Sequence, residues 1–300
     1  MDALMQRGYT TFVRLDSGGQ AKVYRTTKHD RIYAIKVVPI EAQNVEKLDQ
    51  DLRRELNISH NLRHPNCIRV EDMFRTKKRV YIVMDYMPNG TIGNKVRKDG
   101  PLSEWNVKCW FPPIVRAVNY LHENLIAHRD LKLDNVLLDQ YFNPILSDYG
   151  FSRFIEYEHN NPNNEVKLSH TFCGTRSHNP PEVLMYQPYN PFKCDIWCLG
   201  IVLFIMINQV YPFDRNEPRS VMYNKQMKRN YHLQSKIESI ISNNLKHLIN
   251  TLLEPIPSKR PSIDQLCRHQ WFPIIYQELN IYRTIKKQSQ QQQQQQQDNG

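Results

Sequence analysis

The sequence predicts an α+β fold in two lobes, a small β-rich part followed by a larger and mostly helical part. Short runs of β-branched and aromatic residues, separated by turn residues, fill the first third of the chain. After Pro88-Asn89-Gly90 the apolar residues recur at helical spacing. The 300 residues are enough to bury a substantial core, so neither a disulfide nor a structural metal is needed.

The first part is expected to be a small sheet with one helix. The predicted strands are residues 9–15, 21–26, 32–38 and 79–86. Between the third and fourth strands, residues 44–60 place apolar side chains at helical spacing with charges elsewhere, which predicts an amphipathic helix.

The second part is expected to be helical. Ser103 is a suitable N-cap for a helix that runs toward His122, and Pro112-Pro113 should kink or interrupt that helix. Residues 195–207 are apolar nearly all round, which predicts a buried central helix, and the apolar run 196–207 is too short to span a bilayer. Residues 244–253 and 263–269 are further helix candidates.

Composition and charge narrow the function classes without choosing one. The chain has 40% hydrophobic and 23% charged residues, which excludes a wholly disordered protein. Its net charge of +10 suits anionic partners such as a nucleotide, an acidic surface or nucleic acid. The six cysteines form no CxxC pair, which favours reduced thiols and a cytoplasmic location, with the nucleus as an alternative. No secretory signal is expected, and no membrane association. The glutamine run Gln290–Gln297 predicts a disordered tail.

Five motifs that carry chemistry occur in a fixed order. Taken alone, each motif is more often a turn, a lysine at a strand edge or a solvated helix face, with no catalytic role. All five in this order are not expected by chance, so together they indicate a functional site. They are the turn Leu15-Asp16-Ser17-Gly18-Gly19-Gln20-Ala21-Lys22-Val23, the strand Tyr33-Ala34-Ile35-Lys36, Glu55 on the following helix, His128-Arg129-Asp130-Leu131-Lys132-Leu133-Asp134-Asn135, and Asp148-Tyr149-Gly150 followed by Pro180-Pro181-Glu182.

With these motifs the chain resembles the eukaryotic protein kinase family over about residues 9–272. The resemblance implies the bilobal kinase fold, with an N-lobe and hinge over 1–87, a C-lobe over 88–276 and a tail over 277–300. Thr171-Phe172-Cys173-Gly174 and the closing His-x-Trp are similar to the calcium/calmodulin-dependent kinase group. Ala21, followed by Lys-Val, is similar to the testis-specific serine kinases.

The resemblance implies an ATP- and Mg²⁺-dependent kinase that phosphorylates serine and threonine of protein substrates. In this family Lys36 would contact the phosphates and be held by Glu55, and Asn135 and Asp148 would bind Mg²⁺. Asp130 would accept the proton of the substrate hydroxyl, and Lys132 would lie near the γ-phosphate. The residues expected around the nucleotide, with Met84 as gatekeeper, are Leu15, Gly18, Val23, Ala34, Lys36, Met84, Asp85, Met87 and Leu137.

The same resemblance implies regulation through the activation segment. Thr171 matches the phosphorylated residue of the family, and Arg129 and Arg153 match the two arginines that would bind its phosphate after an upstream kinase has acted. Thr175 would face Asp130 and Lys132 at the substrate site. Glu182 with Arg260, and Asp195, are expected to be structural.

Several positions depart from the family pattern, and they keep other functions open. Asp16 and Ala21 replace loop glycines, Tyr149 replaces a phenylalanine, Ser59 stands at an apolar position, and His178 replaces a tyrosine. The loop without its glycines, together with Ser59, favours a pseudokinase scaffold as the alternative. A basic nucleic-acid-binding protein is a third hypothesis, although no recognition motif supports it. Family members that prefer basic substrates have an acidic residue at two positions. Here Asp134 retains one of them and Thr91 replaces the other, so a preference for arginine upstream of the phosphorylated residue depends on Asp134 alone.

Overall fold

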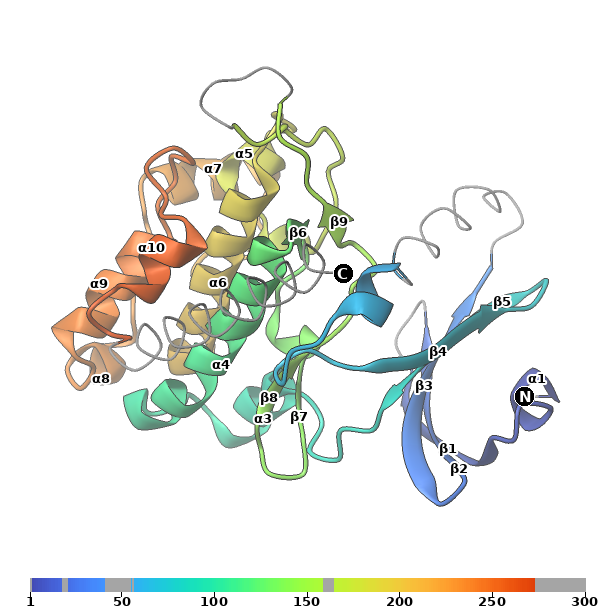
Figure 1. Ribbon diagram of the computed structural model, residues 1–300. Helices are drawn as coiled ribbons and strands as arrows, with labels where there is room; N and C mark the ends of the chain where they lie inside the picture. Colours follow the sequence, from blue (N-terminus) through green and yellow to red (C-terminus); the bar gives the residue numbers. More distant parts are fainter. Residues whose placement is uncertain (1, 18–20, 41–54, 56, 159–164, 273–300) are drawn as a thin grey trace, which may run out of the picture.

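The computed structural model describes residues 2–17, 21–40, 55, 57–158 and 165–272 (Figure 1). They form a five-stranded sheet at one end and a helical body at the other, which confirms the predicted α+β fold. The predicted glutamine-rich tail, and most of the predicted helix 44–60, lie outside the described residues. Of that predicted helix, Glu55 and residues 57–60 are described and are helical.

The sheet has the strand order β1-β2-β3-β5-β4, with all neighbouring strands antiparallel. Four of its strands were predicted within two residues at each end, and the fifth, β4, was not. The strands are β1 (Thr10–Ser17), β2 (Lys22–Lys28), β3 (Arg31–Pro39), β4 (Val70–Arg75) and β5 (Arg79–Asp85).

Alternation along β3 directs its side chains to two faces of the sheet, each of which has its own apolar cluster. Tyr33, Ile35 and Val37 pack in one cluster with Tyr81 and Val83 of β5, beneath the short helix α1 (Asp2–Met5). Because successive side chains point to opposite faces, Ala34 and Lys36 point away from this cluster. The register therefore places Lys36 on the other face, directly opposite Ile82 of β5, which belongs to the second apolar cluster.

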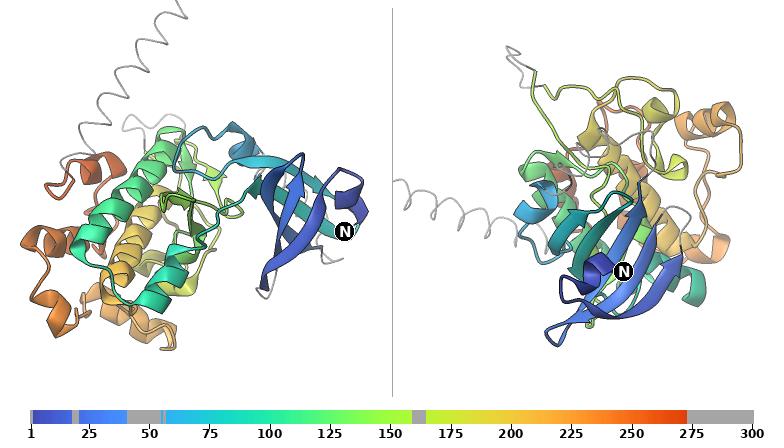
Figure 2. Two further views of the ribbon diagram at one scale, coloured as in Figure 1. Left: turned by 90° about the horizontal axis from the view of Figure 1, so that it is seen from below. Right: turned by 90° about the vertical axis from the view of Figure 1, so that its right-hand side faces the viewer.

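The helical body is built around α6 (Pro191–Asn208), which is buried along nearly its whole length. The helix is 18 residues long and apolar enough to cross a membrane, but 89% of it is buried inside the protein. It is longer than the apolar run that the sequence indicated. Helices α4 (Glu104–Glu123) and α9 (Asn243–Leu252) pack against it (Figure 2). The remaining helices are α3 (Ile92–Asp99), α5 (Pro181–Leu184), α7 (Arg219–Met227), α8 (Ser235–Glu238) and α10 (Ile263–Cys267).

The interruption expected at Pro112-Pro113 does not occur. Helix α4 runs without a break from Glu104 to Glu123, and the Ser103 side chain caps it by accepting from the Asn106 amide at 3.3 Å, as predicted. Val107, Phe111 and Val115 are fully buried along one side of this helix. Packing of that apolar stripe outweighs the hydrogen bonds that the prolines cannot make.

Short elements between α4 and α5 hold the loops that contain Asp130 and Asp148. They are β6 (Ile126–Ala127) paired with β9 (Arg153–Phe154), β7 (Val136–Leu138) paired with β8 (Pro144–Leu146), and the 3₁₀ turns η1 (Leu133–Asn135) and η2 (Arg176–His178). The loop between β6 and β7 contains Asp130, and the segment between β8 and α5 contains Asp148 and Thr171.

Candidate active site

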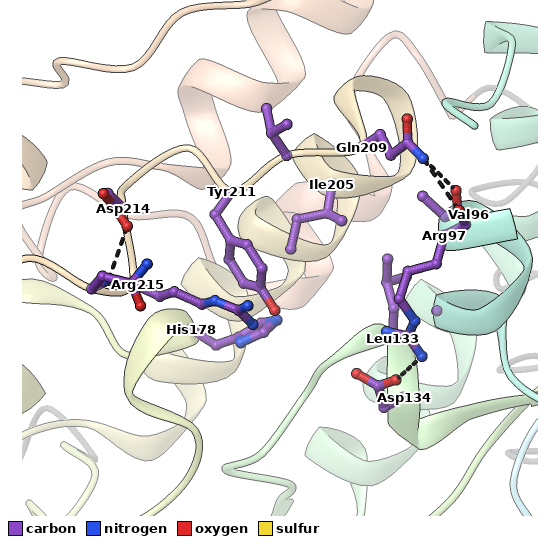
Figure 3. Close-up of a pocket in the computed structure, with 13 residues that line it drawn as sticks. Val96, Arg97, Leu133, Asp134, His178, Ile205, Gln209, Tyr211, Asp214 and Arg215 are labelled. Carbon is purple, nitrogen blue, oxygen red and sulfur yellow. Dashed lines mark hydrogen bonds and ion pairs between the residues drawn. The ribbon is translucent and has the colours of Figure 1, made fainter.

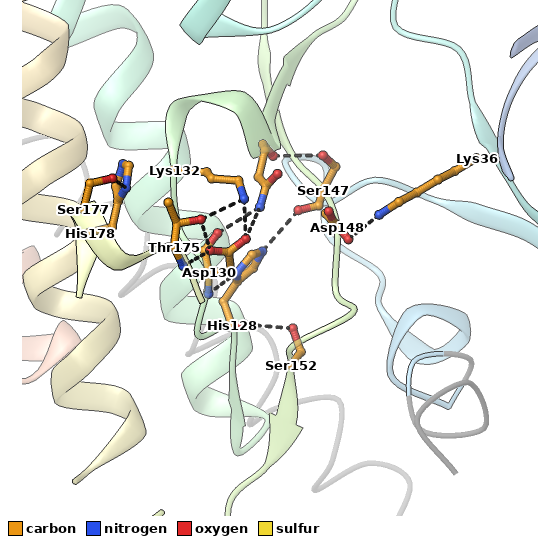
Figure 4. Close-up of polar contacts among 11 residues, drawn as sticks. Lys36, His128, Asp130, Lys132, Ser147, Asp148, Ser152, Thr175, Ser177 and His178 are labelled. Carbon is orange, nitrogen blue, oxygen red and sulfur yellow. Dashed lines mark hydrogen bonds and ion pairs between the residues drawn. The ribbon is translucent and has the colours of Figure 1, made fainter. Parts of the chain in front are cut away.

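Asp130 is the centre of a buried polar network in the loop between β6 and β7 (Figure 4). Its Oδ2 accepts hydrogen bonds from Lys132 Nζ at 2.6 Å and Asn135 Nδ2 at 3.2 Å. Its Oδ1 accepts from the Thr175 amide and from the Thr175 hydroxyl, both at 2.8 Å. Burial opposes ionisation of Asp130, but the hydrogen bond and charge of Lys132 outweigh it and lower the pKa of the carboxyl. Asp130 is therefore a carboxylate able to accept a proton from a hydroxyl.

Asp195 fixes the backbone of this loop from α6. The carboxylate is fully buried and accepts the amides of His128 and Arg129, both at 2.8 Å. It also lies 2.9 Å from His122 Nε2. Arg129 has a φ of 66°, a left-handed conformation that costs free energy and needs such support.

Lys36 and Asp148 meet between the sheet and the helical body. Lys36 Nζ on β3 lies 2.7 Å from Asp148 Oδ1, which follows β8 (Figure 4). Burial opposes the charge on each group, but the attraction outweighs it, so the pKa of Asp148 is lowered and the pKa of Lys36 is raised. Asp148 has a φ of 66°. The charge of Glu55 also raises the pKa of Lys36, and Glu55 Oε2 lies 3.7 Å from where a Cβ on Gly150 would be.

Backbone contacts tie the Asp148 and Asp130 segments together. The amide and hydroxyl of Ser147 donate to the Asn135 carbonyl at 2.8 and 2.9 Å. His128 Nε2 lies 3.2 Å from the Ser147 carbonyl. The structure thus brings the predicted catalytic and metal-binding residues Lys36, Asp130, Lys132, Asn135 and Asp148 into one site.

The donor set around Asn135 and Asp148 fits Mg²⁺ held together with a nucleotide. The side-chain hydrogen bonds of Asn135 both use Nδ2, so its amide oxygen faces elsewhere. With the Asp148 carboxylate it supplies the hard oxygen ligands that Mg²⁺ prefers. Among the described residues no group of three or more His, Cys, Asp or Glu could hold a metal.

The predicted nucleotide residues fall on neighbouring positions of the sheet and the hinge. Val23 is directly opposite Lys36, and Ala34 is directly opposite Met84, so these four side chains lie on the same face of the sheet. Leu137 on β7 pairs with Thr91, just after the hinge. The other predicted residues differ in setting: Leu15 is exposed on β1, Asp85 is paired with Arg31 at 2.7 Å, Met87 is half-buried, and Gly18 lies outside the described residues.

Arg129 contacts the activation segment beside Thr171 rather than Thr171 itself. Its Nε donates to the Phe151 carbonyl at 2.8 Å, and its Nη1 lies 3.5 Å from Ser169 Oγ. The same hydroxyl accepts from the Thr171 amide at 3.2 Å, whereas the Thr171 side chain is exposed. Arg153 is half-buried, and its Nη1 donates to the Ser152 carbonyl at 3.3 Å. Sequence reasoning missed Ser169, because no motif marks it.

A glycine permits close contact between this segment and the catalytic loop. Gly174 has a φ of 86°, and a Cβ there would lie 2.5 Å from the Arg129 carbonyl oxygen. Only glycine fits this approach, which brings Thr175 onto Asp130.

The positions that depart from the family pattern differ in how well they are accommodated. The Tyr149 hydroxyl finds a partner by donating to the Leu146 carbonyl at 3.0 Å. Ser59 Oγ and His178 Nε2 are buried with no hydrogen-bond partner in the part of the chain that the structure describes. Burial lowers the pKa of His178 to about 4, so its ring is neutral near pH 7. The side chain of Asp16 lies outside the described part.

A buried ion pair holds the end of the activation segment. Arg260 donates to Glu182 through Nη1 at 2.9 Å and through Nη2 at 3.2 Å. This matches the structural role expected for both residues.

Comparison with known proteins gives the same answer as the geometry. The protein kinase domain model matches residues 9–272. The chain is 34% identical to testis-specific serine/threonine-protein kinase 3 of Mus musculus over 275 residues, which cover 90% of this chain and 98% of that protein. It is 31% identical to CBL-interacting serine/threonine-protein kinase 7 of Arabidopsis thaliana and 32% identical to CBL-interacting protein kinase 11 of Oryza sativa subsp. japonica. These matches cover 91% and 90% of this chain but only 62% and 52% of the two plant proteins. The site geometry, the family model and these relatives agree, and the chain belongs to the protein kinase family.

Proposed function

We propose that the protein is an ATP- and Mg²⁺-dependent protein kinase that phosphorylates serine and threonine side chains. This proposal rests on the ion pair of Lys36 with Asp148 between the two lobes. It lies next to the Asp130 carboxylate, which accepts a hydrogen bond from Asn135. Phosphoryl transfer depends mainly on positioning and charge neutralisation, and these side chains supply both.

The mechanism assigns one task to each group. Asp148 and the amide oxygen of Asn135 would hold Mg²⁺. The bound ion would neutralise charge on the β- and γ-phosphates of ATP. Lys36 holds the phosphates in place. The hydroxyl oxygen of the protein substrate bonds to the γ-phosphorus as the bond to the ADP oxygen breaks, and the hydroxyl proton passes to Asp130. Lys132, which contacts Asp130 at 2.6 Å, would lie near the γ-phosphate and stabilise the negative charge of the phosphoryl group during transfer.

Regulation by phosphorylation of Thr171 is part of the proposal. A phosphate on this exposed threonine lies within reach of Arg129, which already contacts Ser169 two residues earlier. The paired charges order the segment and hold Thr175 on Asp130. An upstream kinase supplies this phosphate.

A cytoplasmic location is also part of the proposal. It is supported by the cysteines, which are free thiols and mostly buried.

A phosphotransfer assay tests the proposal. The full chain, with Thr171 phosphorylated or unmodified, is incubated with Mg²⁺-ATP and a serine/threonine peptide array. We expect labelling that falls about 10²- to 10⁴-fold in Asp130→Asn, because the proton acceptor is lost. Asp99→Asn, at an exposed surface ion pair, is the matched control and keeps full activity.

A pseudokinase gives a different result in the same assay. The orphaned Ser59 hydroxyl motivates this second candidate, since it stands where the family has an apolar residue. A chain that binds Mg²⁺-ATP but labels no peptide in either Thr171 state would establish the pseudokinase and refute the kinase.

A further inference from the structure

Tyr149, the residue after Asp148, is a buried tyrosine with one directional hydrogen bond. The residue is 1% exposed, and its ring meets the His128 ring edge-on with centroids 5.7 Å apart. Its hydroxyl donates to the Leu146 carbonyl at 3.0 Å. The phenylalanine that the family pattern has at this position could keep the ring contact, but it has no group to donate. The tyrosine therefore adds a contact that the kinase pattern alone does not supply.

This hydrogen bond spans Asp148. Leu146 and Tyr149 stand on either side of Ser147 and Asp148, so the bond closes a small loop that contains the carboxylate. Asp148 has a φ of 66°, in the left-handed region that residues with a side chain adopt only where their surroundings hold them. A bond between residues 146 and 149 opposes relaxation of the backbone between them.

Leu146 is a firm anchor for the hydrogen bond, because several segments hold its backbone. Its amide donates to the Asn66 carbonyl at 2.8 Å, and its carbonyl also accepts from the Ile68 amide at 2.8 Å. On β8 it is paired with Val136 of β7. A carbonyl oxygen has two lone pairs, so it can accept from Ile68 and Tyr149 together. The turn that follows β8 is thereby tied to the chain that leads into β4 as well.

Contacts on both sides therefore fix the direction of the Asp148 carboxylate. Before it, the amide and hydroxyl of Ser147 donate to the Asn135 carbonyl, and after it Tyr149 donates to Leu146. Mg²⁺ demands near-ideal octahedral geometry, so a carboxylate that already points in the right direction binds it at a lower cost in ordering.

We propose that Tyr149 is a positioning residue whose hydroxyl holds the Asp148 turn ready for Mg²⁺ bound together with a nucleotide. It acts through Asp148 and the Leu146 carbonyl. The inference rests on the proposed kinase function for its ligand, whereas the hold on the turn is a property of the protein without any ligand. One hydrogen bond of this kind shifts an equilibrium by about two- to tenfold, and that is the size of the effect expected.

The variant Tyr149→Phe isolates the hydrogen bond. It keeps the ring against His128, and the Leu146 carbonyl keeps the Ile68 amide, so no buried donor or acceptor loses its last partner. The variant should therefore fold, and unchanged hydrogen exchange in a distant element such as α9 checks that it does.

Hydrogen exchange of the full chain without nucleotide or metal measures the hold on the turn. The Ser147 and Ser152 amides are the reporters, since they donate to the Asn135 and Tyr149 carbonyls at 2.8 and 2.9 Å. Their exchange should be about two- to tenfold faster in Tyr149→Phe, because the turn opens more often.

Calorimetric titration with ATP, in Mg²⁺ or in EDTA, measures the consequence for the site. In Tyr149→Phe the dissociation constant in Mg²⁺ should rise about two- to tenfold, whereas the dissociation constant in EDTA should stay as in the wild type. A general loosening of the nucleotide site would raise both constants, so their ratio separates positioning of Asp148 from a merely structural role.

Two other tyrosines provide matched controls. Tyr189 is 2% exposed and also donates its hydroxyl to a backbone carbonyl at 3.0 Å, that of Thr171. Tyr211 lines a cavity between α3, η1 and the end of α6, which neither Leu146 nor Tyr149 lines (Figure 3). Tyr189→Phe and Tyr211→Phe should leave both the exchange of the turn and the ratio of the two dissociation constants unchanged.

Three results would count against the inference. Unchanged exchange at Ser147 and Ser152 in Tyr149→Phe means that the hydroxyl does not hold the turn, whether or not the protein is a kinase. Faster exchange with an unchanged dissociation constant in Mg²⁺ means that the hold does not serve Mg²⁺ binding. If the wild type binds no ATP in either condition, the proposed function fails and the role toward Mg²⁺ fails with it, while faster exchange would still support the hold on the turn.

Discussion

Glu182 and Arg260 show how much one buried charge depends on its partner. The Arg260 side chain is fully buried, and besides Glu182 it donates to the carbonyls of Lys193, Glu254 and Pro255. Its hydrogen-bonding groups are satisfied, but Glu182 is the carboxylate that balances its charge in the contacts the structure gives. Removing that charge leaves a cation where water cannot solvate it.

We therefore expect Glu182→Gln to lower the free energy of unfolding by about 3–5 kcal/mol, the usual cost of breaking a buried pair. Urea denaturation measures the change. Glu156→Gln, at an exposed pair with Lys167, is the control and should cost less than about 1 kcal/mol. Equal effects of the two variants would mean that Arg260 is solvated in solution.

Lys132 sets the ionisation of Asp130, which gives a pH-dependent prediction. The pKa of Asp130 is lowered because Lys132 outweighs the effect of burial. Without the lysine, burial has the larger effect and the pKa of Asp130 rises. Asp130 is then protonated at a higher pH as the solution is acidified. The acidic limb of the kcat/KM profile of Lys132→Met should therefore move to higher pH.

Lys132→Arg keeps a cation near Asp130 and serves as the control for this profile. Its acidic limb should stay close to that of the wild type. An unshifted limb in Lys132→Met would show that Lys132 does not control the protonation of Asp130.

At the scale of elements, the sequence predicted those whose patterns are local. Strand β3 is rich in β-branched and aromatic residues, and α6 is apolar nearly all round, so both were predicted. Strand β4 was not predicted, because the charged residues in Val-Glu-Asp-Met-Phe-Arg interrupt the alternation of apolar and polar side chains. Helix α3 was not predicted either, because it begins with Ile-Gly-Asn, which favours a helix only weakly. Helix α4 was expected to break because its prolines are visible locally, whereas the core that holds it together is not.

The candidate site was predictable to the same extent. Its central residues lie in short motifs, and the structure brings them together as the resemblance implied. The contact of Arg129 with Ser169 and that of Arg97 with Asp134 join residues 40 and 37 positions apart. No spacing rule connects such residues, because folding of the intervening chain decides whether they meet.

The packing of α6 against α9 gives a prediction at this scale. A Cβ on Gly200 would lie 2.7 Å from Leu253 Cδ2 and 2.9 Å from Leu252 Cβ. Gly200→Ala should push the two segments apart and lower the free energy of unfolding by about 1–3 kcal/mol, despite the better helix propensity of alanine. Thermal unfolding measures this change.

Asn224→Ala on α7, an exposed helical position, is the control for Gly200→Ala and should change stability by less than about 0.5 kcal/mol. A Gly200→Ala variant as stable as the wild type would mean that α6 and α9 are not closely packed at this point.

At the scale of the whole molecule, the ion pair of Lys36 with Asp148 joins the sheet to the helical body. Nucleotide bound at this junction should stabilise both lobes together, because only the folded protein binds it. At 100 times its dissociation constant, Mg²⁺-ATP should add about 2.7 kcal/mol. We expect an increase in Tm of about 4 °C for a protein of 300 residues.

Two variants assign that shift to the site. Lys36→Met should lose most of it, and Asp148→Asn should respond equally to ATP with Mg²⁺ and to ATP with EDTA. Differential scanning fluorimetry needs no substrate, so it separates binding from transfer. The same Tm increase in Lys36→Met as in the wild type would place the nucleotide elsewhere.

The burial of α6 also affects how the protein is made. During synthesis α4 emerges before α6, but α9, which packs on α6 as well, is not complete until residue 252. Until then a nascent chain exposes part of an apolar segment that is long enough for a bilayer. Uncovered segments of this kind drive aggregation. Yield in a host cell should therefore depend on chaperones and on how quickly the last third of the chain is translated, and cutting the chain before α9 should give an insoluble product.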